Sequence, residues 1–322
     1  MTPRAPQIPR RGNESERRPS RPDLDSVDLS PEQRTTCLPE QTAAHHALTI
    51  DLEDWHEGML RRLTGSIGRV SQTVKTCTHR LLDLLDAHET RATFFVVGNV
   101  AEEHPELIRE IARRGHEIGS HTHLHLPIYQ QTRAEFRDAM DGTVKLLQDL
   151  SNQPILGFRA PLFSVGSVSH WCFEVLRELG FAYDSSVFPV GSSRYGIANC
   201  PDTPFKINTP SGPIVEFPIA SWQVWGKRVP VGGGSYFRFL PIALLRKAFK
   251  DLEQRHHPAV IYVHPYEFHD GWLEVGWRKP KPVYLKYLVL HNFATRLIAQ
   301  RLSVLLKEHR FGTLRRLYEG YA

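Results

Sequence analysis

The 322-residue sequence lacks any long uninterrupted hydrophobic run. A helix that crosses a bilayer needs about 20 predominantly apolar residues, so a membrane-spanning segment is not expected. The N-terminal residues also lack the apolar segment of a secretory signal peptide. These absences lead us to expect a cytoplasmic protein, peripheral to the inner membrane if it works beside a membrane-bound machine.

Cysteine is scarce, and strong charge of one sign is missing. Without an export signal, we expect the cysteines to be reduced thiols rather than disulfides. The net charge of +5 is mild for this length and does not predict the basic surface that binds nucleic acid. We therefore expect no nucleic-acid partner. The four cysteines lie far apart and form no CxxC pair: Cys37, Cys77, Cys172 and Cys200.

Residues 1–44 have the composition of a disordered tail. They contain seven prolines, seven arginines and seven acidic residues, with few apolar side chains. Such a segment cannot bury enough apolar surface to offset the entropy of ordering. The balance of arginine and acid also argues against a basic arm for a membrane or a nucleic acid. We therefore place one folded domain at residues 45–322.

From residue 45 onward, the apolar pattern alternates between strands and helices. Short apolar runs such as TFFVV, residues 93–97, alternate with amphipathic segments such as residues 105–114. This alternation predicts a parallel α/β sheet, and so many units with short connections favour a barrel-like closure over an open sheet. Residues 190–240 are rich in proline and glycine and predict an inserted β-hairpin region. Residues 283–322 predict a C-terminal helical extension.

Ionisable residues occur where the expected strands end. In a parallel barrel these ends lie on one face, where side chains from different strands meet. Each residue alone is a weak signal, but together they predict a site. They are Asp51, Glu53 and Asp54 after the first strand, His121 and His125 after the third, Arg159 after the fourth, Asp184 after the next and His264 after the last.

The segment GHEIGSHTHLHLP, residues 115–127, holds four histidines, of which two have a spacing suited to a metal. His121 and His125 are separated by three residues and lie on one side of a turn. His116 precedes the expected strand, and His123 points in a different direction. Two imidazoles and one carboxylate with open positions form a common catalytic shell for zinc and related ions.

The neighbouring residues fit a hydrolytic use of a divalent metal, for which zinc is the expectation. Such an ion polarises a carbonyl oxygen and lowers the pKa of bound water to about 7. The acidic residues after the first strand supply one ligand and leave a second carboxylate to act as base. His264 is placed to give a proton to a leaving group. Arg159 would keep the base carboxylate ionised and oriented.

In order and kind, five motifs resemble the polysaccharide deacetylases of carbohydrate esterase family 4, the NodB homology domain. The resemblance covers residues 46–318. Four segments are more narrowly similar to the deacetylases encoded with exosortase (PEP-CTERM) exopolysaccharide loci: DLEDWHE, GGGSYFRFLP, YVHPYEF and RFGTLRRL. The five motifs are TIDLED at 49–54, HTHLH at 121–125, RAP at 159–161, DSS at 184–186 and VHPYEF at 263–268.

The resemblance implies a deformed (β/α) barrel of the NodB type, with the 190–240 region as an insertion. It also implies metal-dependent removal of N-acetyl groups from an aminosugar polymer. The matched residues are Asp51 as catalytic base, His264 as general acid, Arg159 as the tether of the base, His121 and His125 as metal ligands, and Asp184 as a further catalytic residue.

One departure from the family motif concerns the third metal ligand. The family places a metal-binding aspartate directly after the base, but this sequence has Leu52 there, which cannot bind a metal. The ligand must therefore be Glu53 or Asp54. Glu53 shares the strand face of Asp51. Asp54 has the shorter side chain that the family uses, and we prefer it slightly while leaving both open.

The expected function is therefore the deacetylation of an aminosugar polysaccharide, or of its precursor, during exopolysaccharide biosynthesis. The expected partners are the acetylated polymer and membrane-bound synthesis machinery. Two alternatives are an allantoinase-like hydrolase of a small cyclic amide and a catalytically silent glycan-binding module. Four aromatic residues of the insertion predict either a platform for a sugar ring or a small core under loops: Trp222, Trp225, Tyr236 and Phe237.

Overall fold

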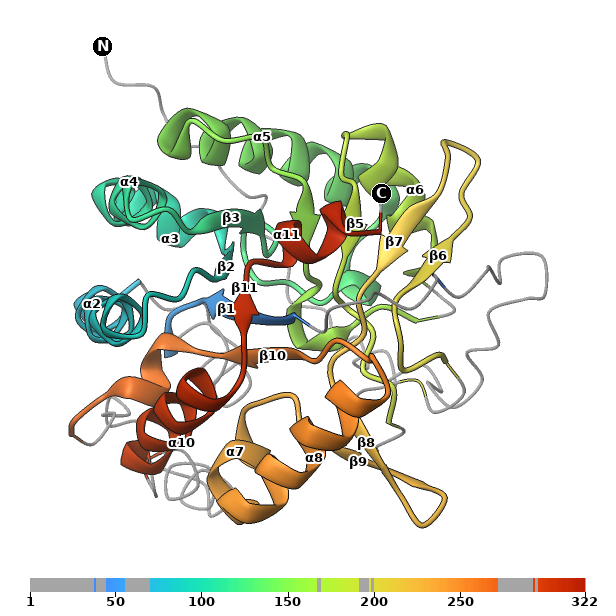
Figure 1. The fold of residues 1–322 in the computed structure, drawn as a ribbon. Helices are drawn as coiled ribbons and strands as arrows, with labels where there is room; N and C mark the ends of the chain where they lie inside the picture. The colour runs from blue at the N-terminus through green and yellow to red at the C-terminus, as the bar shows by residue number, and fades with distance from the viewer. Residues whose placement is uncertain are drawn as a thin grey trace, which may run out of the picture.

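Strand β1 (His46–Leu52) lies between β10 and β2 in a nine-stranded, mostly parallel sheet (Figure 1). The strand order is β10-β1-β2-β3-β4-β5-β7-β6, and β11 pairs with the start of β1. Only β6 and β7 pair antiparallel along this path. The computed structural model describes residues 38, 45–55, 70–166, 169–190, 197, 200–271, 292 and 295–321.

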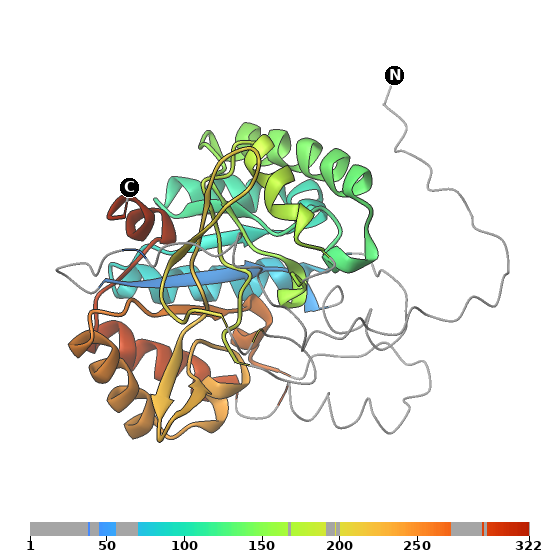
Figure 2. The same cartoon turned by 90° about the vertical axis from the view of Figure 1, so that its right-hand side faces the viewer.

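The other described strands are short, and helices lie outside the curled sheet on several sides (Figures 1 and 2). The strands are β2 (Thr93–Val96), β3 (Glu117–Ser120), β4 (Gly157–Phe158), β5 (Tyr183–Asp184), β6 (Phe205–Ile207), β7 (Ile214–Glu216), β8 (Ser221–Val224), β9 (Lys227–Pro230), β10 (Val260–Val263) and β11 (Phe311–Gly312). The helices are α2 (Gln72–Ala87), α3 (Gly98–Glu103), α4 (Pro105–Arg113), α5 (Arg133–Ser151), α6 (Trp171–Glu178), α7 (Ser235–Phe239), α8 (Ile242–Gln254), α10 (Thr295–Glu308) and α11 (Leu314–Glu319), with short 3-10 turns η3 (Ile128–Gln130), η4 (Pro161–Phe163) and η6 (Pro265–Phe268).

Strand alternation divides the buried residues into two layers. Leu48, Ile50 and Leu52 of β1 belong to the core cluster between the sheet and the helices. Ala47 belongs to a second cluster, which fills the inside of the curl. Successive side chains of a strand point to opposite faces, so Asp51 shares the inner face with Ala47. The inner cluster consists of Ala47, Phe95, Phe163, Tyr183, Phe188, Val215, Phe217, Ile219, Val260, Tyr262, Leu314 and Leu317.

The chain that follows β7 brings the two sides of the sheet together. The backbone N–H of Ala220 donates to the carbonyl of Val260 at 2.9 Å, and that of Tyr262 donates to the carbonyl of Gly232 at 2.7 Å. These hydrogen bonds join the segment around β8 and β9 to the edge strand β10. The prediction of a barrel-like α/β sheet is thereby confirmed.

The inserted and terminal regions are partly integrated into this barrel. Strands β6 and β7 belong to the main sheet, whereas β8 and β9 form a separate antiparallel hairpin. At the other end of the barrel, Leu314 and Leu317 of α11 join the inner cluster. Apart from Leu38, the proposed tail at residues 1–44 lies outside the described residues. None of the helices in the described ranges is both long and apolar enough to cross a membrane.

Residues 219–233 pack closely against β10, and this contact predicts that position 232 must be glycine. A Cβ atom on Gly232 would lie 2.4 Å from a side-chain carbon of Ile219 and 3.0 Å from the carbonyl oxygen of Val260. We expect Gly232→Ala to lower the free energy of unfolding by about 1–3 kcal/mol. Gly142→Ala is the matched control, because a Cβ there meets no atom within 4 Å and the residue lies in α5.

The control should stabilise the protein by about 0.5–1 kcal/mol, the usual gain when alanine replaces glycine within a helix. Urea unfolding of both variants gives the comparison. Equal unfolding midpoints for Gly232→Ala and the unsubstituted protein would show that residues 219–233 do not close tightly on β10.

Candidate active site

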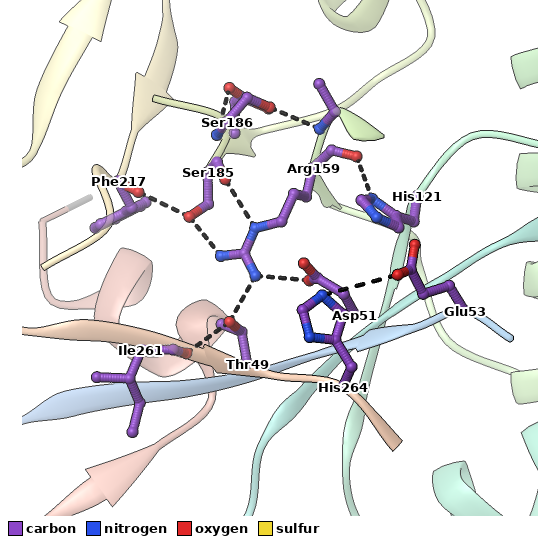
Figure 3. A network of polar contacts seen from close by, with 12 residues as sticks. Thr49, Asp51, Glu53, His121, Arg159, Ser185, Ser186, Phe217, Ile261 and His264 are labelled. Atoms are coloured by element: carbon purple, nitrogen blue, oxygen red, sulfur yellow. Dashed lines mark hydrogen bonds and ion pairs between the residues drawn. The ribbon is translucent and has the colours of Figure 1, made fainter. Parts of the chain in front are cut away.

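Side chains from β1, β3, β4 and β10 meet at the carboxyl ends of the parallel strands (Figure 3). The inner face of β1 presents Thr49 and Asp51 in turn, with Glu53 following just beyond the strand. Each of these three residues is at most 4% exposed. Asp51 and Glu53, two of the acidic residues predicted at the end of the first strand, therefore lie on the inner face.

Arg159 lies at the centre of this arrangement and is completely buried. Its Nη1 donates to Asp51 Oδ1 at 2.7 Å and to Thr49 Oγ1 at 2.6 Å. Its Nε donates to the carbonyl of Ser185 and its Nη2 to Ser185 Oγ, both at 2.8 Å. The guanidinium also stacks 4.4 Å from the ring centre of Phe95. Arg159 thus holds the Asp51 carboxylate in one orientation.

Glu53, His121 and His125 form a cluster of potential metal ligands. One ligand atom from each residue lies within 4.8 Å of the other two, and all three residues are buried. Nε2 of His125 contacts the Glu53 carboxylate directly, and the His121 and His125 rings lie 5.0 Å apart. Nδ1 of His121 lies 2.7 Å from the carbonyl oxygen of Arg159. A carbonyl only accepts, so Nδ1 carries the proton and Nε2 keeps the lone pair that a metal needs.

The turn that carries the two histidines is held in an unusual backbone conformation. Thr122 and His125 have φ angles of 64° and 52°, in the left-handed region that residues with side chains seldom adopt. The start of α3 fixes this turn, because the N–H groups of Gly98 and Asn99 donate to the carbonyls of Thr122 and His123. Strain of this kind persists only where the surroundings enforce it, and it is common at functional sites.

The side chain of Asp54 points elsewhere, which corrects our preference for Asp54 as the third ligand. It accepts hydrogen bonds from the backbone N–H of Ser71, at 2.5 Å, and from Ser71 Oγ, at 3.0 Å. Ser71 is the N-cap of α2, so Asp54 ties the end of β1 to a helix. Strand alternation accounts for this choice, because Glu53 continues the inner face while Leu52 faces the helix layer.

His264 directly follows β10, and its side chain lies close to the carboxylate of Glu53. Its Nε2 is 3.8 Å from Glu53 Oε1, and its ring stacks on Tyr266 with centroids 4.8 Å apart. Nδ1 is 3.4 Å from Glu267 Oε2, an ion-pair distance rather than a well-formed hydrogen bond. Glu267 also accepts from the His264 backbone N–H at 2.9 Å and from Arg238 Nη2 at 2.8 Å.

The charges of the site move the pKa values of its members in opposite directions. Burial opposes protonation of His264, but Glu267, Glu53 and Asp51 together raise its pKa to about 9. Burial likewise opposes ionisation of Glu53, but the neighbouring imidazoles hold the pKa of its carboxyl well below its usual range. Burial lowers the pKa of His121 to about 4, against the attraction of Asp51. The same site therefore contains one protonated histidine, His264, and one neutral histidine, His121.

Asp184, predicted as a catalytic residue, does not reach this site. Tyr183 of the same short strand belongs to the inner cluster, so Asp184 points outward toward the helix layer. Its carboxylate accepts from the N–H and the Oγ of Ser186. Glu216, its partner in the β5–β7 register, lies beside it. The sequence placed Asp184 at the correct strand end but on the wrong face.

Other predicted features lie away from the site. His116 is buried at the start of β3, where its Nδ1 accepts from the N–H of Ala92, and His123 contacts Thr143. The four aromatic residues of the insertion do not gather into a platform. Phe237 is buried in the core, Trp222 packs against the core and donates to Asp251, Tyr236 packs on the inner cluster, and Trp225 is 98% exposed at the turn between β8 and β9.

The donor set of Glu53, His121 and His125 fits a divalent transition metal, since it combines two imidazoles with one carboxylate. A second cluster of the same residue types, within the described ranges, fits less well: His46, Glu253 and His309. There the N–H of Ala259 donates to Nδ1 of His46, so the proton of neutral His46 is on Nε2, which faces Glu253 at 3.4 Å. A protonated nitrogen cannot bind a metal, so this cluster links elements rather than holding an ion.

Several residues of the site carried little signal in the sequence. Glu267 follows His264 by three residues, and this helix-start spacing was its only cue. Thr49 precedes Asp51 by two residues, so strand alternation could have placed it on the inner face. Arg238 lies within the segment GGGSYFRFLP, but nothing in that segment indicated its ion pair with Glu267.

Two family models match adjacent parts of the chain. Residues 65–183 match a model described as polysaccharide deacetylase, and residues 185–319 match one described as a domain of unknown function, DUF3473. The matches meet within β5, in the middle of one continuous sheet. The chain therefore carries a polysaccharide deacetylase domain together with DUF3473 residues, and the latter include β10 and His264.

Curated relatives are similar over part of their length. The chain is 33% identical over 107 residues to the peptidoglycan-N-acetylglucosamine deacetylase of Bacillus cereus, which covers 33% of this chain and 48% of that protein. It is 42% identical over 62 residues to the chitooligosaccharide deacetylase of a Bradyrhizobium species, covering 19% of this chain and 28% of that protein. The chain thus spans less than half the length of these two relatives.

Solved structures share the fold over nearly the whole chain. A Mycobacterium smegmatis protein classed with the polysaccharide deacetylases superposes with a TM-score of 0.60 at 21% identity, covering 89% of this chain and 93% of that chain. The PuuE allantoinase superposes with a TM-score of 0.56 at 16% identity, covering 95% and 98%. These likenesses concern the fold alone, and they confirm the prediction of a deformed (β/α) barrel.

The different environments of Glu53 and Asp54 predict different effects of removing each charge. We expect Glu53→Gln to lower affinity for zinc by more than the roughly 10–100-fold that loss of a ligand's hydrogen-bonding partner costs. Asp54→Asn should keep zinc affinity within about tenfold but lower the unfolding midpoint, because Ser71 loses a charged acceptor. Calorimetric titration of chelator-treated protein measures both affinities. A larger loss of zinc affinity in Asp54→Asn than in Glu53→Gln would make Asp54 the ligand.

Proposed function

We propose that this chain, in which a polysaccharide deacetylase domain continues into DUF3473 residues, is a metal-dependent hydrolase that removes N-acetyl groups from an aminosugar polysaccharide. One observation carries the proposal: a His₂Glu cluster lies beside a carboxylate held by arginine and a histidine held by glutamate. A metal-dependent amide hydrolase uses a metal, a base and an acid that act on the same carbonyl group.

The proposed base is Asp51. A divalent metal held by Glu53, His121 and His125 would polarise the acetyl oxygen and lower the pKa of a bound water to about 7. Asp51 accepts the proton of the attacking water on the carboxylate oxygen that Arg159 leaves available. Arg159 binds Oδ1 at 2.7 Å, which leaves Oδ2 to accept the proton of the attacking water while the ion pair is kept. Thr49, which shares the same guanidinium group, keeps Arg159 from rotating away.

The proposed acid is His264. Its raised pKa, near 9, keeps the imidazole protonated at neutral pH, so a proton is present when the amine departs. Glu267 stabilises this charge and is itself held by Arg238, and all three residues contribute to a buried chain of alternating charge. Donation from His264 to the amine nitrogen completes C–N cleavage and leaves a free amino sugar and acetate.

The finer substrate proposal is an exopolysaccharide, or its precursor, that carries N-acetylated amino sugars. The similarity of four segments to the deacetylases of exosortase loci supports it, as do the names of the two curated relatives, which act on acetylated glycans. In this proposal the protein works beside membrane-bound synthesis machinery. Zinc is the proposed metal, because two imidazoles and one carboxylate suit it.

Acetate release from a panel of acetylated oligosaccharides tests the proposed function. We expect release with zinc, cobalt or manganese, and a loss of at least about 100-fold after chelation, since the metal supplies several kcal/mol of stabilisation. Asp51→Asn should abolish release from the same substrates. Turnover of a cyclic ureide without acetate release would favour an allantoinase-like reaction, and an unchanged rate with Asp51→Asn would refute the assignment of the site.

Two histidine substitutions should separate metal binding from proton donation. His264→Ala should lower kcat by about 100–10,000-fold, the usual contribution of a general acid, with little change in zinc affinity. His125→Ala should lower both kcat and zinc affinity, because it removes a ligand. Equal zinc affinity in the two variants and the unsubstituted protein would contradict the assigned roles.

A further inference from the structure

Two buried carboxyl groups of the barrel take no part in the proposed chemistry, although one belongs to the DSS motif. Asp184 of β5 and Glu216 of β7 occupy paired positions in the strand register. Both side chains are 0% exposed, and both point to the outer face of the sheet. We call them the acid pair. Two ionised carboxylates cannot lie side by side in the interior without a large repulsion, so the acid pair must hold a proton.

The hydrogen bonds of the acid pair show where that proton lies. Asp184 accepts from the N–H of Ser186 at 3.1 Å and from its Oγ at 2.7 Å, which suits an ionised carboxylate. Glu216 Oε1 accepts from the N–H of Val187 at 2.9 Å, while its buried Oε2 has no donor. A proton on Oε2 resolves this, because the resulting O–H can donate to Asp184.

The acid pair acts on the segment that holds Arg159. Residues 185–187 follow β5, and Ser185 gives Arg159 two of its acceptors, the carbonyl and Oγ. Ser186 Oγ accepts from the N–H of Ala160, the residue after Arg159, while donating to Asp184. The acid pair therefore anchors both the acceptors of the guanidinium and the backbone beside it.

We infer that Glu216 is a neutral acid that donates a hydrogen bond to Asp184, and that this acid pair positions Arg159 against Asp51. Glu216 is then a positioning residue for the reaction, although it touches neither the substrate nor the metal ligands. The inference rests on the proposed deacetylase function for its kinetic part and on the structure alone for the protonation of Glu216.

The electrostatics agree with this geometry. Burial and then the charge of Asp184 raise the pKa of Glu216 well above its usual range. Burial raises the pKa of Asp184 too, but hydrogen bonds from Glu216 and Ser186 oppose the rise. Asp184 is therefore the more acidic member, and the shared proton resides on Glu216. The single negative charge that remains is on Asp184, and it attracts the guanidinium of Arg159.

Three variants test the positioning role. Glu216→Leu removes the donor to Asp184 and the acceptor for Val187, so we expect kcat for acetate release to fall by about 10-fold to 100-fold, the cost of a misplaced catalytic group. KM and zinc affinity should stay within about twofold. Glu216→Gln restores both hydrogen bonds without a charge and should recover kcat to within about threefold. Glu117→Leu, at the opposite end of the barrel, is the matched control for the loss of a buried carboxyl group.

A double-mutant cycle with Arg159→Lys distinguishes positioning from general destabilisation. If the acid pair acts through Arg159, Glu216→Leu should cause little further loss of kcat in the Arg159→Lys background, while its effect on the unfolding midpoint should persist. Fully additive losses of kcat would overturn the positioning role. So would Glu216→Gln as inactive as Glu216→Leu, or a fall in kcat with Glu117→Leu equal to that with Glu216→Leu.

An infrared difference spectrum tests the protonation of Glu216 without any assay of activity, and remains usable if Glu216→Leu does not fold. At neutral pH, the spectrum of the unsubstituted protein minus that of Glu216→Gln should contain the carbonyl band of a protonated carboxylic acid. Other carboxyl groups cancel in the difference, including Glu117, whose pKa burial raises to about 7. Absence of the band would overturn the neutral-acid assignment. Its presence in a protein that releases no acetate would refute the proposed function while leaving the acid pair intact.

Discussion

The positive charge of Arg159, enclosed within the barrel, constrains the arrangement of everything around it. Arg159 directly follows β4, and β1 carries Asp51, yet two other strands separate β1 from β4 in the sheet. The side chain therefore crosses the inside of the curl instead of running along it. A buried charge without its partner is strongly destabilising, so the ion pair requires the curvature that brings these strands together. The shape of the sheet and the orientation of the base thus depend on each other.

Much of this arrangement could be predicted from local patterns. Strand–helix alternation predicted the barrel, and the ends of parallel strands predicted that Asp51, His121, Arg159 and His264 would meet. The period of two residues along a strand also favoured Glu53, because it continues the inner face that Asp51 begins. Our slight preference for Asp54 rested on side-chain length, which mattered less than direction. Leu52 departs from the family motif at a position that faces the helices, where an apolar residue is well accommodated.

The remaining features depend on contacts that no local pattern records. Asp184 lies on a strand of two residues, and so short a strand gives no alternation from which to read its face. The partner of that residue, Glu216, comes from a strand formed within the region we had taken as an insertion. Arg238 reaches Glu267 from α7, across 29 residues of chain. In each case the decisive information is which segments become neighbours in space.

The pairing of β11 with β1 has a consequence for synthesis of the chain on the ribosome. Phe311 and Gly312 pair with His46 and Ala47, and the neighbouring Leu314 is part of the inner cluster. Contacts so distant in sequence form late and slowly. Every residue of the proposed chemistry has already been translated by position 267, but the apolar interior stays open until these later residues emerge. During that interval the nascent chain is exposed to chaperones and proteases, because the site residues have been translated but β11 and α11 have not.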